Sequence, residues 1–330
     1  MQKKQFGTTR LKVSSIGFGA WGIGGPAMAG DTPIGWGDVD DAVSVKALKR
    51  AYDKGIRFYD TADFYGLGHS EELIGKSIAE HRDAVIATKV GHRLRDDGTI
   101  ALDYSKEHIL NACENSLRRL CRDQIDLYQL HSAKLSHLKE GECIEAMERL
   151  KEEGKIRYWG ISLNTFNPEP EAEFLMQRNL GDSFQVVFNI INQRAFPLIR
   201  KAAKRGYGII ARMPLQFGIL TGKFNSGTTF PENDHRAFRL PRPLLKETLA
   251  SLDEIWPIAD SYTISKTSLS LSFVTSIPEI STVIPGIKTP EQVDVNTTEI
   301  IKLIDQDMKD LFELGKGKFA RLTSLMEQQG

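Results

Sequence analysis

The sequence has little cysteine, no excess charge of either sign and no long apolar run. Its 330 residues include 3 cysteines, 43 Lys and Arg side chains and 43 Asp and Glu side chains, so the formal net charge at pH 7 is +0. Without a cationic surplus, a chain lacks the attraction to phosphate that general nucleic-acid or anionic-membrane binding requires. No segment approaches the roughly 20 apolar residues of a membrane-spanning helix. We therefore expect neither nucleic acid nor a membrane as a partner.

The cysteines Cys113, Cys121 and Cys143 are too few and too irregularly spaced for a disulfide framework. Cys113 and Cys121 fall in one helical pattern, about 12 Å apart at a rise of ~1.5 Å per residue, which is beyond disulfide reach. The first ten residues carry basic side chains, but no apolar stretch follows them, so no signal peptide or anchor is expected. These features favour a protein of the reducing cytoplasm.

Metal ligands are also not evident, because His69, His92 and His235 lack a paired ligand spacing, and we predict no metal site. Apolar residues are plentiful, at 41% of the chain. A chain of this length can bury roughly 75% of its unfolded surface. Since repeats and low-complexity stretches are absent, we expect one domain over residues 1–330.

Short apolar runs typical of strands alternate along the chain with longer amphipathic stretches typical of helices. Eight strands are predicted, at Ser15–Phe18, Ile56–Asp60, Ala84–Lys89, Ile125–His131, Ile156–Ser162, Phe184–Phe188, Gly208–Arg212 and Thr282–Pro285. Eight helices are predicted, at Val43–Lys54, Ser70–Glu80, Lys106–Leu120, Glu142–Glu153, Glu169–Arg178, Phe196–Arg205, Ser265–Ser276 and Pro290–Thr298. Eight successive βα units indicate an α/β fold of the closed (β/α)8 or TIM-barrel type rather than an open doubly wound sheet.

Three segments lie outside this repeat. Residues 243–262 and 305–326 have helical patterns and are expected to form two extra helical segments outside the barrel. Thr9–Val13, with Phe6 and Gly7 before it, is expected to form an N-terminal hairpin that plugs the barrel floor.

Polar residues close three neighbouring predicted strands, at the barrel end where catalytic residues lie. Asp60 leads into the run Asp-Thr-Ala-Asp-Phe-Tyr-Gly, which contains Tyr65, while Lys89 and His131 end the next two strands. Each has an ordinary structural interpretation: a turn or cap aspartate, a surface lysine, a core histidine and a packing tyrosine. Together they are harder to explain by packing, because a buried lysine is costly unless it is paired.

The segment from Gly17 to Gly22 has the G-x-G-x-x-G spacing of dinucleotide-binding Rossmann folds. In those folds the third glycine opens a helix, but here Gly-Gly-Pro follows, and no helical periodicity begins before Asp40. We interpret the glycines as a loop at the exit of the first strand. Trp21 and Trp36 could line an apolar substrate pocket there, or pack in the core.

Asp60, Tyr65, Lys89 and His131 resemble the catalytic tetrad of the aldo-keto reductases. Similar motifs extend over nearly the whole chain, in the family's order: Gly68-His69-Ser70-Glu71-Glu72, Gly160-Ile161-Ser162, Pro214-Leu215-Gln216-Phe217-Gly218-Ile219-Leu220-Thr221-Gly222-Lys223 and Ile284-Pro285-Gly286-Ile287-Lys288. The resemblance implies a (β/α)8 barrel that reduces a small-molecule carbonyl substrate with a nicotinamide cofactor and without a Rossmann domain.

Carbonyl reduction gives these residues complementary tasks. Hydride addition creates an alkoxide, so the site needs a proton donor and positive potential at the developing oxyanion. A phenol, with an ordinary pKa of about 10, is a weak acid unless its anion is stabilised. We expect Tyr65 to be the general acid, Lys89 to stabilise its anion and Asp60 to keep Lys89 charged. His131 is expected to hydrogen-bond the carbonyl oxygen, so the substrate pocket includes Trp21, Tyr65 and His131.

The resemblance also implies how the cofactor is held. Ser162 and Gln185 would hydrogen-bond the nicotinamide carboxamide, whereas Asn164 stands one position away from the family pattern. Arg212 occupies a position where many relatives have an aromatic that stacks on the nicotinamide, and a planar guanidinium can also stack. The predicted cofactor-binding set is Gly19, Ala20, Trp21, Asp60, Ser162, Asn164, Gln185, Arg212, Pro214, Leu215, Gly218, Leu220, Gly222, Lys223, Arg236, Gly286, Lys288, Thr289, Gln292 and Asn296.

The phosphates of the cofactor are expected near two segments. Leu215–Lys223 suits a loop over a pyrophosphate, with Arg236 as a second cation and residues 225–235 as loop. After the eighth strand a helix begins whose N-terminal amides favour an anion. By analogy Lys288 meets an adenosine 2′-phosphate, with Thr289, Gln292 and Asn296 completing the adenosine pocket. NADP(H) is therefore favoured over NAD(H).

Two other functions are compatible with this sequence. A Schiff-base aldolase also uses a strand-end lysine such as Lys89. The family-like barrels of potassium-channel beta subunits suggest a cofactor-loaded interaction module with slow turnover. A sugar, a methylglyoxal-like aldehyde and a ketone all remain open as substrates, and the sequence specifies neither reaction direction nor oligomeric state.

Overall fold

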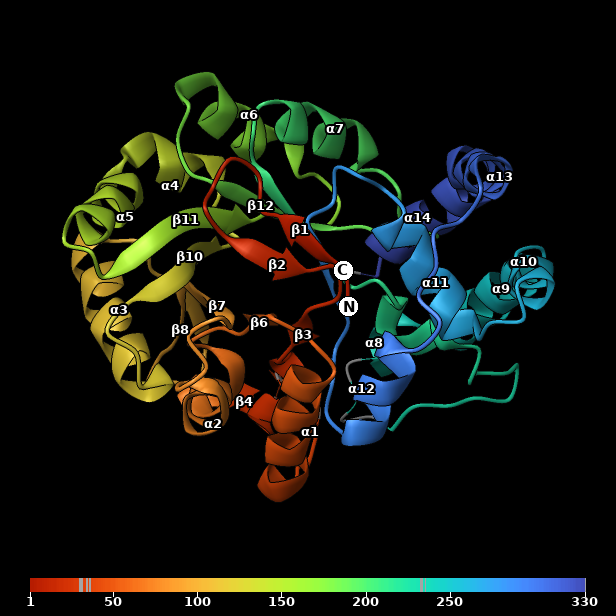
Figure 1. Cartoon of the computed structure of the whole chain (residues 1–330), viewed down its shortest axis with the longest axis horizontal. Helices are drawn as coiled ribbons and strands as arrows, with labels where there is room; N and C mark the ends of the chain where they lie inside the picture. Colours follow the sequence, from red (N-terminus) through yellow and green to blue (C-terminus); the bar gives the residue numbers. More distant parts are fainter. Residues whose placement is uncertain (30–31, 34, 36, 232–233, 235, 330) are drawn as a thin grey trace.

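Eight parallel strands form a barrel surrounded by helices (Figure 1). The computed structural model describes residues 1–29, 32–33, 35, 37–231, 234 and 236–329. The strand order is β14-β13-β12-β11-β10-β7-β6-β3. Parallel bridges Ile16–Val283 and Gly19–Gly286 join the two edge strands. The predicted (β/α)8 barrel is confirmed, and the first and last helices of the ring lie side by side where it closes (Figure 1).

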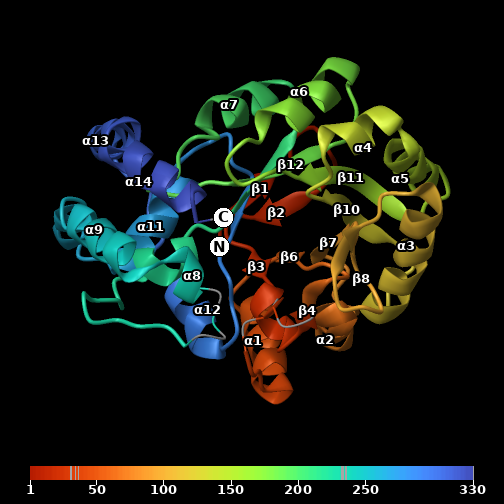
Figure 2. The same cartoon turned by 180° about the vertical axis from the view of Figure 1, so that it is seen from behind.

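The barrel strands are β3 (Phe18–Gly19), β6 (Phe58–Asp60), β7 (Val85–Val90), β10 (Ile125–His131), β11 (Ile156–Ser162), β12 (Ser183–Val187), β13 (Gly208–Arg212) and β14 (Thr282–Ile284). The surrounding helices are α1 (Asp41–Asp53), α2 (His69–Ile78), α3 (Lys106–Leu120), α5 (Glu142–Glu152), α6 (Glu169–Arg178), α7 (Phe196–Lys204), α11 (Lys266–Thr275) and α12 (Pro290–Thr297). They enclose the strands in the view from behind as well (Figure 2). All sixteen predicted elements are present. The first strand differs most from its predicted span, because only Phe18 and Gly19 pair with β6.

Polar caps explain where several of these helices begin. The Asp40 side chain accepts hydrogen bonds from two backbone amides in the first turn of α1. Ser105, Ser265 and Thr289 cap α3, α11 and α12 in the same way. Each cap satisfies amides that have no partner within the helix. Capping therefore fixes where the chain turns from a barrel loop into a helix.

The N-terminal hairpin closes the amino end of the barrel. Strands β1 (Lys3–Gln5) and β2 (Lys12–Ser14) pair antiparallel and lie in front of the barrel strands in Figure 1. The hairpin begins earlier than expected: β2 overlaps the predicted span Thr9–Val13, whereas its partner β1 precedes that span and Thr9 lies in the turn. Phe6, Leu11 and Val13 are buried and form a cluster with residues from β6, β7, β10, β13 and β14. Gly7 has φ +54° where a Cβ would lie 2.3 Å from Gly206 O, so this turn requires glycine.

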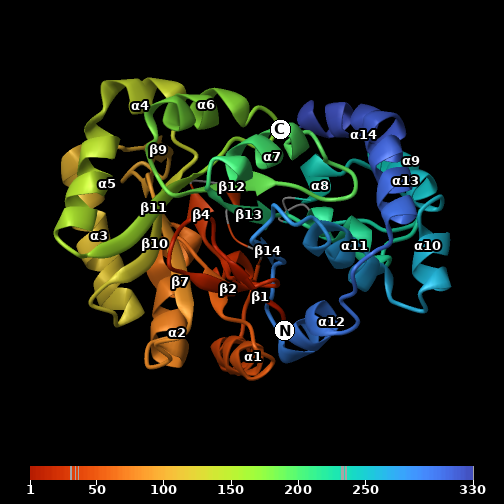
Figure 3. The ribbon, with the colours of Figure 1, turned by 45° about the horizontal axis from the view of Figure 1, so that its top comes forward.

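Both extra helical segments lie on one side of the barrel (Figure 3). Each is split rather than continuous: α9 (Arg242–Leu252) is followed by α10 (Trp256–Ser261), and α13 (Asp305–Lys316) by α14 (Lys318–Glu327). Gly317, at φ −98° and ψ −103°, leaves helical geometry between α13 and α14. α14 packs on α9, where Arg321 pairs with Glu247 at 2.7 Å.

Further short elements follow the carboxyl ends of the strands and were not predicted. They are η1 (Trp21–Gly24), β4 (Met28–Ala29), β5 (Thr32–Pro33), η2 (Tyr65–Gly68), β8 (His92–Leu94), β9 (Ile100–Leu102), α4 (Leu135–Glu140), η3 (Gln216–Thr221) and α8 (Arg236–Arg239). These segments build the mouth of the barrel. Trp36 and His235, singled out in the sequence, lie outside the described residues.

Two further observations concern the described part of the chain. All three cysteines are free, and Cys121 is the left-handed residue that ends α3. No described helix combines the length and the apolar character needed to cross a bilayer.

Candidate active site

Lys89, Asp60 and Tyr65 are in direct contact at the carboxyl end of the barrel. The Lys89 Nζ atom donates to Asp60 Oδ2 at 2.6 Å, to the Thr61 carbonyl at 2.8 Å and to the Tyr65 hydroxyl oxygen at 3.1 Å. Lys89 is 0% exposed and Asp60 2% exposed. Because the Lys89 ammonium donates to the phenolic oxygen, the proton of the Tyr65 hydroxyl remains free to be donated to another acceptor.

Lys89 stays charged in this buried position. Burial by itself lowers the pKa of the Lys89 ammonium, but attraction to Asp60 and then to Tyr65 outweighs burial and raises the pKa above its ordinary value. A buried pair of this kind is tolerated when hydrogen bonds satisfy the remaining polar atoms. The arrangement holds a permanent positive charge against the phenol.

Two glutamines satisfy the other oxygen of Asp60. Its Oδ1 atom accepts from Gln185 Nε2 at 2.7 Å and from Gln129 Nε2 at 3.2 Å. Ser162 donates from Oγ to Gln185 Oε1 at 3.3 Å, so the predicted carboxamide ligands Ser162 and Gln185 lie together in the barrel. Gln129 was missed. The signal was available, because it precedes His131 by two positions in one strand and therefore faces the same side.

His131 ends β10 beside the tyrosine. Its ring centroid lies 5.8 Å from that of Tyr65, in an edge-on arrangement. Burial, followed by the nearby His92 and Lys89, holds the pKa of His131 well below its ordinary value, so the imidazole is neutral at neutral pH. Within the described residues its Nδ1 atom is buried without a hydrogen-bond partner. The four predicted catalytic residues are thus brought to one place.

Two predicted cofactor residues, Arg212 and Asn164, differ in their surroundings. Arg212 ends β13 and donates from Nη2 to the Leu163 carbonyl at 3.1 Å and to Thr165 Oγ1 at 3.2 Å. Burial lowers the pKa of its guanidinium, and Tyr65 and Asp60 act in the opposite direction. Asn164 is exposed, and its Oδ1 atom accepts from the Phe166 and Asn167 amides in a turn. Arg212 therefore lies near Tyr65 and Asp60, whereas Asn164 shapes a loop.

The first-strand glycines bring backbone segments together rather than opening a Rossmann helix. Gly19 N donates to the Pro285 carbonyl at 3.0 Å, and Ala20 N donates to the Asp60 carbonyl at 2.9 Å. Trp21 begins η1, and its ring lies 6.3 Å from that of Tyr65. Since the next α-helix begins only at Asp41, the G-x-G-x-x-G spacing does not form the Rossmann turn that opens a pyrophosphate-binding helix.

The loop from Met213 to Gly222, which includes Pro214, Leu215 and Leu220, folds sharply after β13. Met213, Gln216 and Phe217 have φ values of 54°, 43° and 55°, and Gly218 and Gly222 are also left-handed. Such conformations persist in larger residues only when the surroundings hold them. Asn189 Nδ2 does so by donating to the Met213 carbonyl at 2.9 Å and to Gln216 Oε1 at 2.8 Å.

Three cations meet beside this loop. Burial lowers the pKa values of Lys223 and Lys288, and the positive charge of Arg236 lowers both further, so Arg236 lies near each of the two lysines. Arg236 also pairs with Asp234 at 2.5 Å. The stem of Lys288 packs on Gly22, where a Cβ would lie 2.7 Å from the lysine Cγ. Mutual repulsion of this kind is relieved by an anion, which fits the phosphates of a dinucleotide.

The remaining predicted cofactor residues lie just before α12 or within it. Thr289 caps the helix by accepting from the Gln292 amide at 3.3 Å, and Gln292 Oε1 accepts from the Lys288 amide at 2.6 Å. Asn296 is buried in α12. Gly286 faces open space, with no atom within 4 Å of a Cβ built there. Thr289 and Gln292 therefore hold the backbone where α12 begins, next to Lys288.

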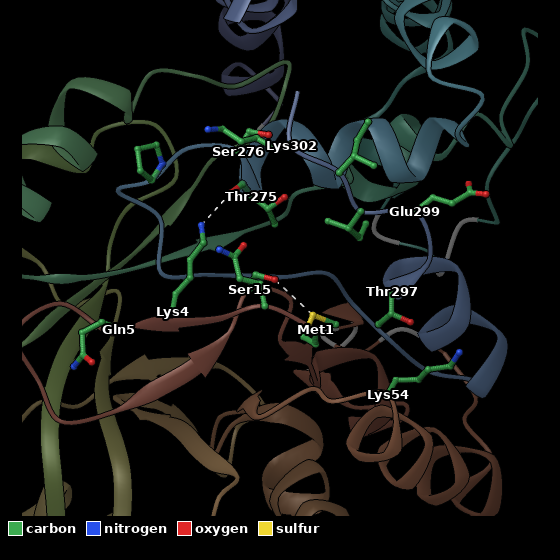
Figure 4. Close-up of a pocket in the computed structure, with 14 residues that line it drawn as sticks. Met1, Lys4, Gln5, Ser15, Lys54, Thr275, Ser276, Thr297, Glu299 and Lys302 are labelled. Carbon is green, nitrogen blue, oxygen red and sulfur yellow. Dashed lines mark hydrogen bonds between the residues drawn. The ribbon is translucent and has the colours of Figure 1, made fainter. Parts of the chain in front are cut away.

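A separate pocket lies at the other end of the barrel (Figure 4). It has a volume of about 770 Å³ and lies between the hairpin, the end of α11 and residues 297–302. Lys4 reaches across it and donates from Nζ to the Thr275 and Ile280 carbonyls, both at 3.0 Å. This lysine therefore caps α11 and has no part in the tetrad.

Comparison with known proteins identifies the class to which this fold and site belong. The model of the Aldo/keto reductase family matches residues 15–316. The chain therefore belongs to the aldo/keto reductase family, whose members are oxidoreductases that use nicotinamide cofactors.

Individual relatives cover most of the chain. "Uncharacterized oxidoreductase YqkF" of Bacillus subtilis (strain 168) is 30% identical over 318 residues, which is 94% of this chain and 95% of the relative. "Probable voltage-gated potassium channel subunit beta" of Arabidopsis thaliana is 29% identical, with 95% and 96% covered. "Aldo-keto reductase yakc [NADP(+)]" of Schizosaccharomyces pombe is 29% identical, with 91% and 88% covered.

A solved structure is similar over the same length. The glycerol dehydrogenase AKR11B4 from Gluconobacter oxydans has a TM-score of 0.80 and 28% sequence identity, and the match covers 95% of each chain. The similarity thus extends to the whole barrel.

Proposed function

We propose that this protein is an NADPH-dependent oxidoreductase that reduces small aldehydes, sugars or ketones to alcohols, with Tyr65 as the general acid. The observation that carries the proposal is the 3.1 Å contact between the Tyr65 hydroxyl and the fully buried, charged Lys89. A phenol held against an ammonium ion is suited to give up a proton when an alkoxide forms beside it.

Each residue of the tetrad has one task in this mechanism. The bound cofactor supplies the hydride. Tyr65 donates its hydroxyl proton to the oxygen of the substrate, and Lys89 stabilises the phenolate that is left. Asp60, held by Gln129 and Gln185, keeps the ammonium in place. Neutral His131 donates its single N–H to the carbonyl oxygen and orients it.

The proposed cofactor site combines Arg212 with the three cations. The planar guanidinium of Arg212 would hold the nicotinamide by stacking, while Lys223 and Arg236 would hold the pyrophosphate. Lys288 would hold the adenosine 2′-phosphate, which favours NADP(H) as the cofactor. The name of the Schizosaccharomyces pombe relative, which includes NADP(+), supports this choice. The free cysteines support a reducing cytoplasm as the location.

Replacing Lys288 by Met is expected to raise the dissociation constant for NADPH about tenfold and to leave that for NADH unchanged. Loss of one charge-assisted hydrogen bond to phosphate accounts for about 1.4 kcal/mol. Quenching of tryptophan fluorescence by each cofactor measures both constants. Lys302→Met, at the far end of the barrel, is the matched control. Equal weakening of NADPH and NADH would contradict the assignment.

Replacing Gln129 by Leu is expected to lower kcat about tenfold and to destabilise the fold by about 1–2 kcal/mol. The reason is that Asp60 Oδ1 loses one of its two neutral donors in a buried position. Steady-state kinetics and urea unfolding provide the measurements. Gln124→Leu is the control, because Gln124 is exposed and donates only to the Gly154 carbonyl. Unchanged kcat and stability in the Gln129 variant would contradict this role.

The two alternatives are less favoured. A Schiff-base aldolase needs a neutral lysine amine, whereas Asp60 raises the pKa of Lys89 and keeps it charged. Borohydride with a carbonyl substrate should therefore trap no adduct on Lys89. An interaction module with slow turnover is separated from a metabolic enzyme by measuring turnover against a panel of small aldehydes.

A further inference from the structure

The side chain of His92 lies beside the proposed catalytic residue His131. It lies three residues beyond Lys89, at the start of β8. Its ring centroid is 4.3 Å from that of His131, at an interplanar angle of 61°, and 5.4 Å from that of Phe64. The side chain is partly exposed. A second imidazole therefore borders the place where His131 meets the carbonyl oxygen.

One hairpin positions both histidines. His92 pairs with Leu102 across β8 and β9, and the Asp103 amide donates to the Gly91 carbonyl at 2.9 Å. Tyr104 follows directly and donates its hydroxyl to the His131 carbonyl at 2.6 Å. The Tyr104 ring packs on Gly91, where a Cβ would lie 2.1 Å from it. Because the same short segment fixes His92 and the end of β10, the spacing of the two imidazoles is set by the backbone.

His92 has unused hydrogen-bonding capacity. Burial, followed by repulsion from Lys89, lowers its pKa to about 4, so the ring is neutral at neutral pH. A neutral imidazole offers one N–H donor and one acceptor nitrogen. Within the described part of the chain, neither ring nitrogen of His92 takes part in a hydrogen bond.

We propose that His92 is a substrate-binding residue that selects carbonyl compounds carrying a hydroxyl group on the carbon next to the carbonyl. This inference rests on the proposed function. A hydroxyl both donates and accepts, so it matches either nitrogen of a neutral imidazole. A carboxylate would need a cation at this position, and an alkyl group would leave a polar nitrogen unpaired. The carbonyl oxygen and the neighbouring hydroxyl lie on adjacent carbons, which suits two adjacent imidazoles.

The test compares two aldehydes that differ by one hydroxyl group, 2-hydroxypropanal and propanal. In His92→Phe the ring and its packing on Phe64 are kept while both nitrogens are lost. We expect kcat/KM for 2-hydroxypropanal to fall about tenfold and kcat/KM for propanal to stay within about threefold, because one neutral hydrogen bond is removed. His92→Gln, which keeps a donor and an acceptor, should restore most of the preference.

The control is His81→Phe, since His81 stacks on Tyr52 with ring centroids 3.8 Å apart and away from the tetrad. An unchanged ratio of the two kcat/KM values in His92→Phe overturns the inference alone. This outcome includes an equal fall of kcat/KM for both aldehydes, because a purely structural role of His92 would act on both. If the wild-type protein reduces neither aldehyde while cofactor binds, the proposed function fails and the inference fails with it.

Discussion

Replacing Tyr65 by Phe is expected to lower kcat for carbonyl reduction by about 10²–10⁴-fold, the range that a positioned general acid contributes. The change removes only the hydroxyl whose oxygen lies 3.1 Å from Lys89 Nζ, and the ring can keep its place beside His131. Cofactor affinity should stay close to that of the wild-type protein, because the phenol has no part in the cation cluster. Single-turnover oxidation of NADPH measures the chemical step, and fluorescence titration measures binding.

Tyr52→Phe is the matched control for this variant. Tyr52 donates its hydroxyl to Asp83 at 2.8 Å on the surface of the molecule, so it should leave kcat unchanged. Full activity in the Tyr65 variant would remove the tyrosine from the mechanism. Loss of cofactor binding together with activity would instead give Tyr65 a structural role.

Replacing Lys89 by Met is expected to affect both stability and catalysis. Asp60 is 2% exposed and would lose the only cationic hydrogen-bond donor that the described residues give it, which leaves a buried charge without compensation. Breaking such a pair from one side costs about 3–5 kcal/mol. Loss of positive potential at the phenol should also lower kcat by about 10²–10³-fold. Urea unfolding and single-turnover kinetics measure the two effects.

A double variant, Asp60→Asn with Lys89→Met, separates the two effects. Removing both charges should restore most of the lost stability, since no buried charge is left unpaired. The activity should stay low, because the phenolate is still not stabilised. A Lys89→Met variant as stable and active as the wild-type protein would show that the buried Asp60–Lys89 pair contributes neither to stability nor to catalysis, and would contradict this account.

The barrel and the tetrad could be predicted because both depend on local patterns. Apolar runs ending in Asp60, Lys89 and His131 place these residues at strand ends, and parallel strands bring such ends to one edge. The structure has all three within or at the end of the expected strands. Gln129 was predictable from its spacing to His131, which puts both on one side of the strand, but the sequence does not show that it donates to Asp60.

The mouth of the barrel could not be predicted, because its conformation depends on contacts distant in the sequence. Met213, Gln216 and Phe217 take left-handed conformations that larger residues disfavour, and Asn189 from another loop holds them. The β8–β9 hairpin places His92 beside His131. The sequence gave His92 no role, because it lacks the paired spacing of a metal ligand. Such positions are set by tertiary packing rather than by local propensity.

The most direct test of the central claim follows the near-ultraviolet absorbance of NADPH when the wild-type protein is mixed with small aldehydes, sugars and ketones. The account predicts carbonyl-dependent oxidation of NADPH, faster than that of NADH at equal concentration and nearly abolished in the Tyr65→Phe variant. Binding of NADPH without oxidation by any carbonyl compound, or equal oxidation by the wild-type and Tyr65→Phe proteins, would contradict it.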